Sequence, residues 1–200
     1  MNEGHQVCDS PEWRTAVREE IIPWAAGEVD LGDDVLEVGP GYGATTDVFA
    51  ELLPRLTSVE IDPDLAARLQ DRYRDTHVEV VLGDATNLSF PDERFSGAVC
   101  FSMLHHVPSP ELQDRLFAEV ARVLRAGGPI VALDSVESDG LRAFHEGDNY
   151  QPIDPTTLPA RLTAAGFTDV DVRVNEYGWT ALARRSTSRP AGRDGQSRGR

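Results

Sequence analysis

The chain contains no lysine, so each of its nineteen basic residues is an arginine. A lysine amine is required for Schiff-base chemistry, for the attachment of pyridoxal phosphate and for the lysine of phosphate-binding loops. The sequence therefore excludes these enzyme classes.

Cysteine and long apolar runs are also scarce. The two cysteines, Cys8 and Cys100, form neither a disulfide framework nor a metal-binding spacing. No apolar run approaches the ~18 residues that would span a bilayer, and the first residues lack the features of a secretory signal. We expect a cytoplasmic protein that does not insert into membranes.

Acidic residues outnumber basic ones by 34 to 19. Residues 184–200 carry six arginines and one acid, which leaves residues 1–183 with 13 arginines and 33 acids, a net charge of −20. Such an acidic body repels a phosphodiester backbone, so nucleic acid is not expected as a partner. The Arg/Gly/Ser-rich residues 184–200 are predicted to be a disordered tail.

The length of 200 residues and the hydrophobic share of 40% are typical of one globular domain, which we place at residues 1–183. Short apolar segments alternate with segments of helical periodicity. The expected strands are residues 34–38, 56–60, 78–82, 96–102, 130–134, 169–175 and 178–184. The expected helices are residues 10–24, 44–53, 63–73, 110–125 and 154–165.

This alternation predicts an α/β fold with a Rossmann-like, doubly wound sheet of seven strands, mostly parallel. The last two strands are too close for a crossover helix, so they should form an antiparallel hairpin.

Two segments flank the predicted core at residues 33–134. The opening helix, residues 10–24, is interpreted as a lid. Residues 135–153 form a polar connection that is longer than usual, which indicates a substrate-binding loop. Within it, His145 and Tyr150 are candidate substrate contacts; an ordinary solvated loop is the alternative.

A strand, a glycine-rich turn, a helix and a second strand ending in an acid can hold a nucleoside. The turn is Gly39-Pro40-Gly41-Tyr42-Gly43, preceded by Glu37, and the acid is Glu60. Glycines let the backbone approach a ligand closely, and a carboxylate accepts hydrogen bonds from ribose hydroxyls. Alone, this pattern fits NAD enzymes as well as methyltransferases. The Gly-x-Gly-x-Gly spacing and a third acid, Asp84, favour methyltransferases.

From about Asp33 to Asp134 the chain resembles the class I S-adenosylmethionine-dependent methyltransferases, specifically the small-molecule type that includes quinone-biosynthesis C-methyltransferases. Met103-Leu104-His105-His106-Val107 is similar to their LHHV segment. Residues 124–129 are similar to their LxPGG turn, with Ala126 where proline is usual.

The resemblance implies S-adenosylmethionine as cosubstrate, no metal, and methyl transfer to an oxygen, carbon or nitrogen atom of a small molecule. In this family the glycine turn holds the methionine end of the cosubstrate. The acid after the second strand holds the ribose, and the acid after the third strand holds the adenine. In chain order the implied cosubstrate residues are Glu37, Gly39, Gly41, Gly43, Glu60, Ile61, Asp84, Ala85, Phe101 and Ser102, the last two lining the sulfonium.

His105 and His106 follow the fourth strand and are the candidate catalytic residues. A histidine there could remove a proton from an acceptor hydroxyl, phenol or activated carbon. Alternatively, the two histidines cap a helix or fill the pocket floor. Two other functions stay open for the chain: an NAD-dependent oxidoreductase, disfavoured by the absence of a Tyr-x-x-x-Lys pair, and a non-catalytic S-adenosylmethionine-binding protein.

Overall fold

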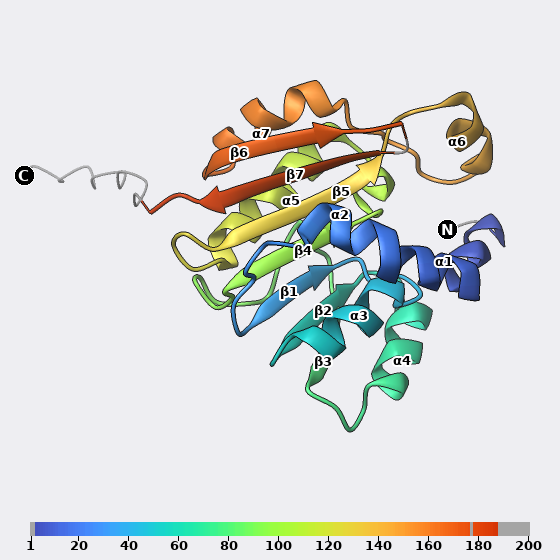
Figure 1. Ribbon diagram of the computed structural model, residues 1–200, viewed down its shortest axis with the longest axis horizontal. Helices are drawn as coiled ribbons and strands as arrows, with labels where there is room; N and C mark the ends of the chain where they lie inside the picture. Colours follow the sequence, from blue (N-terminus) through green and yellow to red (C-terminus); the bar gives the residue numbers. More distant parts are fainter. Residues whose placement is uncertain (1–2, 177, 188–200) are drawn as a thin grey trace, which may run out of the picture.

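The computed structural model describes residues 3–176 and 178–187. Its centre is a seven-stranded sheet in the order β3-β2-β1-β4-β5-β7-β6 (Figure 1). The strands are β1 (Val35–Val38), β2 (Leu56–Glu60), β3 (Val78–Leu82), β4 (Gly97–Phe101), β5 (Pro129–Ser135), β6 (Phe167–Val174) and β7 (Gly178–Arg185). The first five are parallel and β7 runs antiparallel to both neighbours. The predicted Rossmann-like sheet with an antiparallel C-terminal hairpin is confirmed.

Helices cover both faces of the sheet. Before the sheet come η1 (Glu3–Asp9), α1 (Pro11–Ala16), the π-helical turn η2 (Val17–Ile21) and α2 (Ile22–Ala26). The others are α3 (Ala44–Leu52), α4 (Pro63–Arg72), η3 (Leu104–His106), α5 (Pro110–Val123), α6 (Asp139–Phe144), η4 (Pro155–Thr157) and α7 (Leu158–Ala164).

Two apolar cores lie on opposite faces of the sheet. Along β5, Ile130 and Ala132 pack into the core under α5 and α7, whereas Val131 and Leu133 pack into the core under the N-terminal helices and α3. Successive side chains of a strand point to opposite faces, so a strand covered on both faces is apolar throughout. This explains why the strands are readable as short continuous apolar runs.

The opening segment is not one continuous helix. Ser10 caps α1, its hydroxyl accepting from the Trp13 amide at 3.1 Å, as the sequence predicts. The Ile22 amide then donates to the Val17 carbonyl, five residues back. Pro23, which lacks an amide proton, follows directly. The irregularity that precedes Pro23 is therefore a π turn, and π turns are frequent at functional sites.

Three boundary predictions need correction. The connection at residues 135–153 contains helix α6, because the Ser138 hydroxyl caps it by accepting from the Leu141 amide at 3.2 Å. The single helix expected at 154–165 is instead η4 followed by α7. Arg184 and Arg185, assigned to the tail, are the last residues of β7. The rest of the predicted tail, from residue 188, lies outside the described residues.

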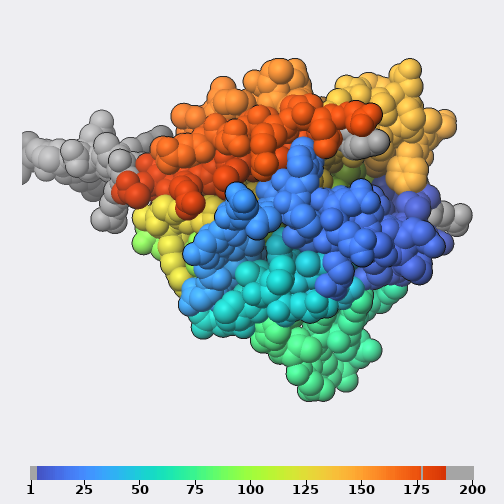
Figure 2. All heavy atoms as spheres, viewed as in Figure 1, coloured from blue at the N-terminus to red at the C-terminus, as the bar shows by residue number. Residues whose placement is uncertain are grey.

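The N-terminal segment and α6 meet at the end of the sheet to which the arrows of β1 and β5 point (Figure 1). In the space-filling view, the blue N-terminal atoms adjoin the yellow-orange atoms of the α6 region (Figure 2). The rings of His5 and Phe144 lie edge to face at this junction, with centroids 4.9 Å apart. Within the described residues, no helix has the length and apolar character needed to cross a membrane.

Candidate functional site

A cavity of about 330 Å³ opens at the carboxyl ends of β1, β2 and β4. In open α/β sheets this edge is where ligands bind, beside the point where the strand order reverses. The order β2-β1-β4 places that point between β1 and β4. The cavity is therefore located where the topology favours a ligand, and its size is in the range of small-molecule sites.

The glycine turn after β1 forms one wall of the cavity. Gly39, Gly41 and Gly43 have φ angles of +66°, +55° and +81°, which L-residues with side chains rarely adopt. A Cβ atom on Gly39 would lie 2.8 Å from Met103 Cβ, whereas one on Gly41 would meet nothing within 4 Å. Gly39 and Gly41 line the cavity and Gly43 does not.

Glu60 joins the end of β2 to the glycine turn. One carboxylate oxygen accepts from the Gly41 amide and the other from the Asp62 amide, both at 2.9 Å. The side chain is 4% exposed and lines the cavity, and burial raises its pKa. Ile61, beside it, also lines the cavity and is 68% exposed. The structure thus brings together Gly39, Gly41, Glu60 and Ile61.

Glu37 is positioned differently from the other predicted cosubstrate residues. Its buried carboxylate accepts hydrogen bonds from the hydroxyls of Thr45, Thr46 and Ser58 at 2.5, 2.8 and 2.6 Å. Burial raises its pKa, and its side chain does not line the cavity. Direct contact with a cosubstrate stays a prediction; the geometry supports a role in positioning Thr45, which does line the cavity.

The third predicted acid lies outside the cavity. Asp84 is exposed after β3, and its carboxylate accepts from the Thr86 amide at 2.8 Å. Neither Asp84 nor the buried Ala85 lines the cavity. Leu82, which pairs with Glu60 across the sheet, is 54% exposed at this edge. Leu82 does not line the cavity either, so the contacts predicted for the adenine at Asp84 and Ala85 stay predictions.

Phe101 and Ser102 form the cavity wall at the end of β4. Ser102 has φ +53°, an uncommon conformation for a residue with a side chain, and its amide donates to the Leu133 carbonyl at 2.8 Å. Backbone strain of this kind persists where the surrounding structure fixes it, often at ligand sites. Both residues line the cavity, and their role beside the sulfonium stays a prediction.

The two candidate catalytic histidines have distinct surroundings. His105 Nδ1 lies 2.6 Å from an Asp134 carboxylate oxygen, and its amide donates to the other oxygen at 3.0 Å. His106 lines the cavity and His105 does not. Burial and the neighbouring imidazoles lower the pKa of His106 to about 3, so its ring is neutral at pH 7. Sequence analysis missed Asp134 as a partner, although it ends the strand adjacent to β4.

The predicted substrate residues lie behind the cavity wall. The rings of His145 and Tyr150 are stacked with centroids 4.4 Å apart, and neither residue lines the cavity. Asp148 and Asn149 from the same connection do line it. Residues 135–153 therefore reach the cavity through positions other than those chosen from the sequence.

The N-terminal segment forms the remaining side of the cavity, and five of its residues line it. These residues are His5, Cys8, Trp13, Val17 and Ile21. Its role as a lid stays a prediction. Trp13, Val17 and Ile21 recur at helical spacing in the sequence, whereas nothing in the sequence marked His5 or Cys8.

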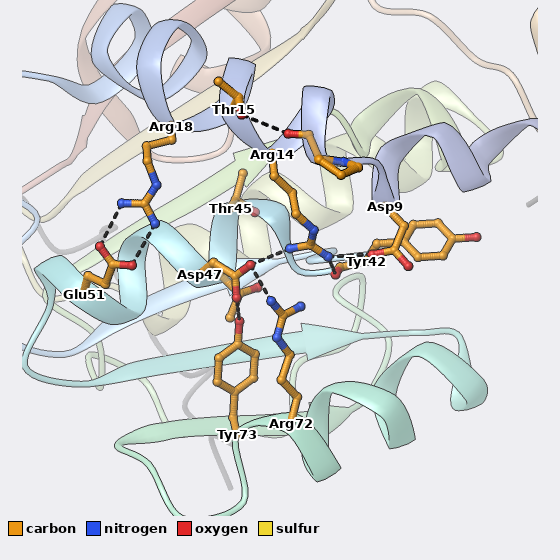
Figure 3. A network of polar contacts seen from close by, with 12 residues as sticks. Asp9, Arg14, Thr15, Arg18, Tyr42, Thr45, Asp47, Glu51, Arg72 and Tyr73 are labelled. Atoms are coloured by element: carbon orange, nitrogen blue, oxygen red, sulfur yellow. Dashed lines mark hydrogen bonds and ion pairs between the residues drawn. The ribbon is translucent and has the colours of Figure 1, made fainter.

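Arg14 of α1 connects the N-terminal segment to the glycine turn by hydrogen bonds (Figure 3). The Arg14 guanidinium donates to the Tyr42 carbonyl at 3.0 Å, to Asp9 at 2.6 Å and to Asp47. Asp47 also accepts from Arg72 at 2.6 Å. The lid is thus connected to the turn, to α3 and to α4 by one group of charges.

The sequence is similar to known methyltransferases. Residues 36–132 match the family model described as a methyltransferase domain. The chain is 30% identical over 138 residues to a phosphatidylethanolamine N-methyltransferase of Cereibacter sphaeroides, covering 67% of this chain and 62% of that protein. It is 39% identical over 92 residues to ribosomal RNA small subunit methyltransferase A of Cupriavidus pinatubonensis, covering 45% of this chain and 33% of that protein.

The fold is shared with a solved protein from Pyrococcus horikoshii OT3, with a TM-score of 0.75, 20% identity, and coverage of 93% of this chain and 100% of that one. The chain spans between a third and three fifths of the length of the two curated relatives described. The family match over residues 36–132 and the shared fold support a class I S-adenosylmethionine-dependent methyltransferase domain. The relatives act on acceptors as different as a lipid headgroup and ribosomal RNA, so the class alone does not name the acceptor.

Proposed function

We propose that this chain transfers a methyl group from S-adenosylmethionine to an oxygen, carbon or nitrogen atom of a small molecule. The observation that carries the proposal is Glu60, which is buried at the cavity rim and hydrogen-bonded to the Gly41 amide. A ribose placed there would meet a preorganised carboxylate. The methionine end would lie over Gly39 and Gly41, and the adenine between Ile61 and the exposed Leu82.

The reaction requires little from protein side chains. The sulfonium donor is already activated, so the acceptor atom displaces the sulfur in line, the methyl carbon moves to the acceptor, and S-adenosylhomocysteine leaves. The protein must hold the acceptor roughly 3–3.5 Å from the methyl carbon and exclude water. Trp13, Val17 and Ile21 of the lid supply apolar surface for this purpose.

A hydroxyl, phenol or activated-carbon acceptor must also lose a proton. His106 is at the cavity surface in its neutral form, and His105 is oriented by the Asp134 carboxylate. A base held by a carboxylate is the arrangement used in general-base catalysis. We assign proton removal to His105 or His106, whichever the acceptor reaches.

A small-molecule acceptor is favoured over ribosomal RNA by charge and by the segment after β4. Residues 1–183 carry a net charge of −20, which repels RNA. Enzymes that methylate exocyclic amines of nucleic acid resemble one another in an Asn/Asp-Pro-Pro-aromatic segment, and here the corresponding residues are Phe101-Ser102-Met103-Leu104. The RNA-methylating relatives make RNA the alternative to include in the test.

The first experiment is a calorimetric titration with S-adenosylmethionine, S-adenosylhomocysteine and NAD, on the native chain and on Glu60→Ala. We expect binding of the first two ligands only, and at least tenfold weaker binding by the variant. Glu79→Ala, a change of an exposed glutamate on β3, is the matched control and should bind as the native chain does. Binding of NAD alone would overturn the assignment in favour of an oxidoreductase.

Transfer of a labelled methyl group then separates an enzyme from a non-catalytic binding protein. We expect label in at least one member of a panel of small phenols, amines and activated carbon acids, and none in ribosomal RNA. Label in RNA alone would replace the acceptor class. Tight cosubstrate binding without any transfer would support the non-catalytic alternative.

A further inference from the structure

Three histidines from distant parts of the chain converge beside the cavity. His5 comes from η1, His106 from η3 and His145 from the residue after α6. One ring nitrogen of each lies within 4.8 Å of one ring nitrogen of each of the other two. We call His5, His106 and His145 the histidine trio. In the part of the chain that the structure describes, no other group of His, Cys, Asp or Glu meets the same criterion.

In each ring of the trio, Nδ1 faces an oxygen atom of the protein. His145 Nδ1 lies 2.7 Å from the Leu141 carbonyl, which can only accept, so Nδ1 carries the proton. His106 Nδ1 lies 3.3 Å from the Asn149 carbonyl in the same sense. His5 Nδ1 lies 3.7 Å from an Asp148 carboxylate oxygen. In the neutral rings of His145 and His106 the lone pair then belongs to Nε2, whereas the 3.7 Å separation at His5 is longer than a hydrogen bond and does not fix its tautomer.

His145 supplies a second, independent observation. Its Nε2 atom is buried and has no hydrogen-bond partner, although the residue is only 4% exposed. A buried acceptor without a partner costs free energy, and native proteins seldom leave one without a reason. A neutral imidazole whose Nδ1–H is held by an oxygen, with Nε2 left over, is the form in which histidine binds a metal ion.

Simple ring packing does not explain the arrangement. The ring contacts of the trio have centroids 4.9 to 5.3 Å apart, which aromatic packing alone would satisfy. Packing does not require each Nδ1 to face an oxygen, however, and it leaves the buried Nε2 of His145 unsatisfied. Tilted rings also allow small rotations that bring the nitrogens together.

A fourth histidine lies beside the trio but outside it. His105 packs on His106 with centroids 4.1 Å apart, but its Nδ1 bonds to Asp134 and it is not part of the trio.

We propose that His5, His106 and His145 bind one divalent transition-metal ion, with Zn²⁺ as the representative, and leave a coordination position open toward the cavity. Three imidazoles with an open fourth position form a typical catalytic zinc site. Nitrogens bound at about 2.0–2.1 Å lie roughly 3.3 Å apart in a tetrahedron, so side-chain shifts of about an ångström complete the site. No metal was expected from the sequence, because His5, His106 and His145 are far apart in the chain and form no recognisable ligand spacing.

The open position faces the cavity that His5 and His106 line, together with Asp148 and Asn149. An acceptor hydroxyl or enol oxygen bound there would lose its proton more readily and would be held for in-line attack. With the metal bound, the Nε2 lone pair of His106 is used for coordination, so the metal ion would replace His106 as the group that promotes loss of the proton. This role rests on the proposed methyl transfer, whereas metal binding itself does not. The site thereby favours oxygen-bearing acceptors.

The test is a Zn²⁺ titration of tag-free, chelator-treated protein at pH 7.5, followed by calorimetry, with Co²⁺ absorption as a report on tetrahedral geometry. We expect one equivalent per chain. His145→Ala and His5→Ala should each weaken binding at least about 100-fold, since even changes to residues that support metal ligands cost 10–100-fold. The matched control is His77→Ala, which removes an exposed histidine bonded to the Ala50 carbonyl, and it should bind as the native chain does.

Thermal unfolding and titration of metal-free protein with S-adenosylhomocysteine show whether each variant is folded. The proposal is overturned if the native chain binds no Zn²⁺ at micromolar concentration, or if folded His145→Ala binds it as tightly as the native chain. Neither result affects Glu60, so the cosubstrate titration fails or succeeds separately from the metal titration.

Discussion

The two sides of the cavity are built in different ways. On one side, which we call the glycine region (residues 37–61), consecutive strands and one turn place backbone amides and buried carboxylates at the sheet edge. On the other, which we call the histidine region, η1, η3 and residues 139–150 contribute side chains that are distant in the sequence. The glycine region depends on local backbone geometry; the histidine region depends on tertiary assembly.

This difference suits the two roles expected of the cavity, which are binding the cosubstrate and selecting the acceptor. A cosubstrate shared by a whole family can be held by backbone that the fold itself fixes. Segments outside the sheet can vary without disturbing it, which suits the part that selects the acceptor. The predictions below test whether the glycine region is as rigid, and the histidine region as separable, as this comparison requires.

The largest effect is expected at Glu37, where the glycine region is part of the core. Glu37→Ala should lower the free energy of unfolding by about 3 kcal/mol or more, because the hydroxyls of Thr45, Thr46 and Ser58 lose their common acceptor. Urea unfolding followed by circular dichroism measures it.

Glu79→Ala is the control. It removes a carboxylate from β3, two strands away in the sheet, where the Glu79 side chain is exposed and paired with Arg94. It should cost about 0.5 kcal/mol or less. Equal effects of the two substitutions would mean that the Glu37 network does not stabilise the fold.

The next effect separates the two regions by function. In metal-free protein, His105→Ala or His106→Ala should lower turnover roughly 100-fold with an acceptor found in the screen, as expected for loss of a general base. Cosubstrate affinity should be nearly unchanged, because neither side chain belongs to the glycine region. Steady-state kinetics and calorimetry on the same preparations measure both quantities. Unchanged turnover in both variants would remove the catalytic assignment.

The same comparison explains how far the sequence could be read. The strands, the glycine turn and Glu60 were predictable because short-range patterns determine them. His5 was not, because its place beside His106 and His145 depends on how the N-terminal segment folds across the sheet. Asp134 was identified as a strand end without its partner, since only strand pairing brings it to His105.

A smaller effect is expected where the two regions are joined. Arg14→Ala removes the bonds to Asp9, to Asp47 and to the Tyr42 carbonyl of the glycine turn, so the lid should be held less firmly. Affinity for S-adenosylhomocysteine should fall about tenfold, and limited proteolysis should cut the N-terminal segment faster.

Arg18→Ala is a closely matched control. Arg18 follows on the same segment and donates to both oxygens of Glu51 on α3 at 2.7 and 2.8 Å, but it is exposed and does not touch the turn. Its loss should change affinity less than twofold. If both variants weakened S-adenosylhomocysteine binding equally, the affinity would depend on the overall rigidity of the N-terminal segment. It would then not depend on the bond from Arg14 to the Tyr42 carbonyl.

The smallest effect concerns the protonation of Glu60. Burial raises its pKa above the ordinary value of 4.5, so the carboxylate begins to take up a proton at a higher pH than an exposed glutamate would. A carboxylate binds hydroxyls more strongly than a neutral acid does, so affinity is retained above the raised pKa and declines as the pH falls through it. We expect a several-fold weakening of S-adenosylhomocysteine binding as the pH is lowered from 8 toward 5, measured by calorimetry.

Glu60→Gln should bind more weakly than the native chain at neutral pH and show no such dependence. A native profile as flat as that of Glu60→Gln would show that Glu60 keeps its charge throughout this range, and that the buried amide donors of Gly41 and Asp62 outweigh desolvation.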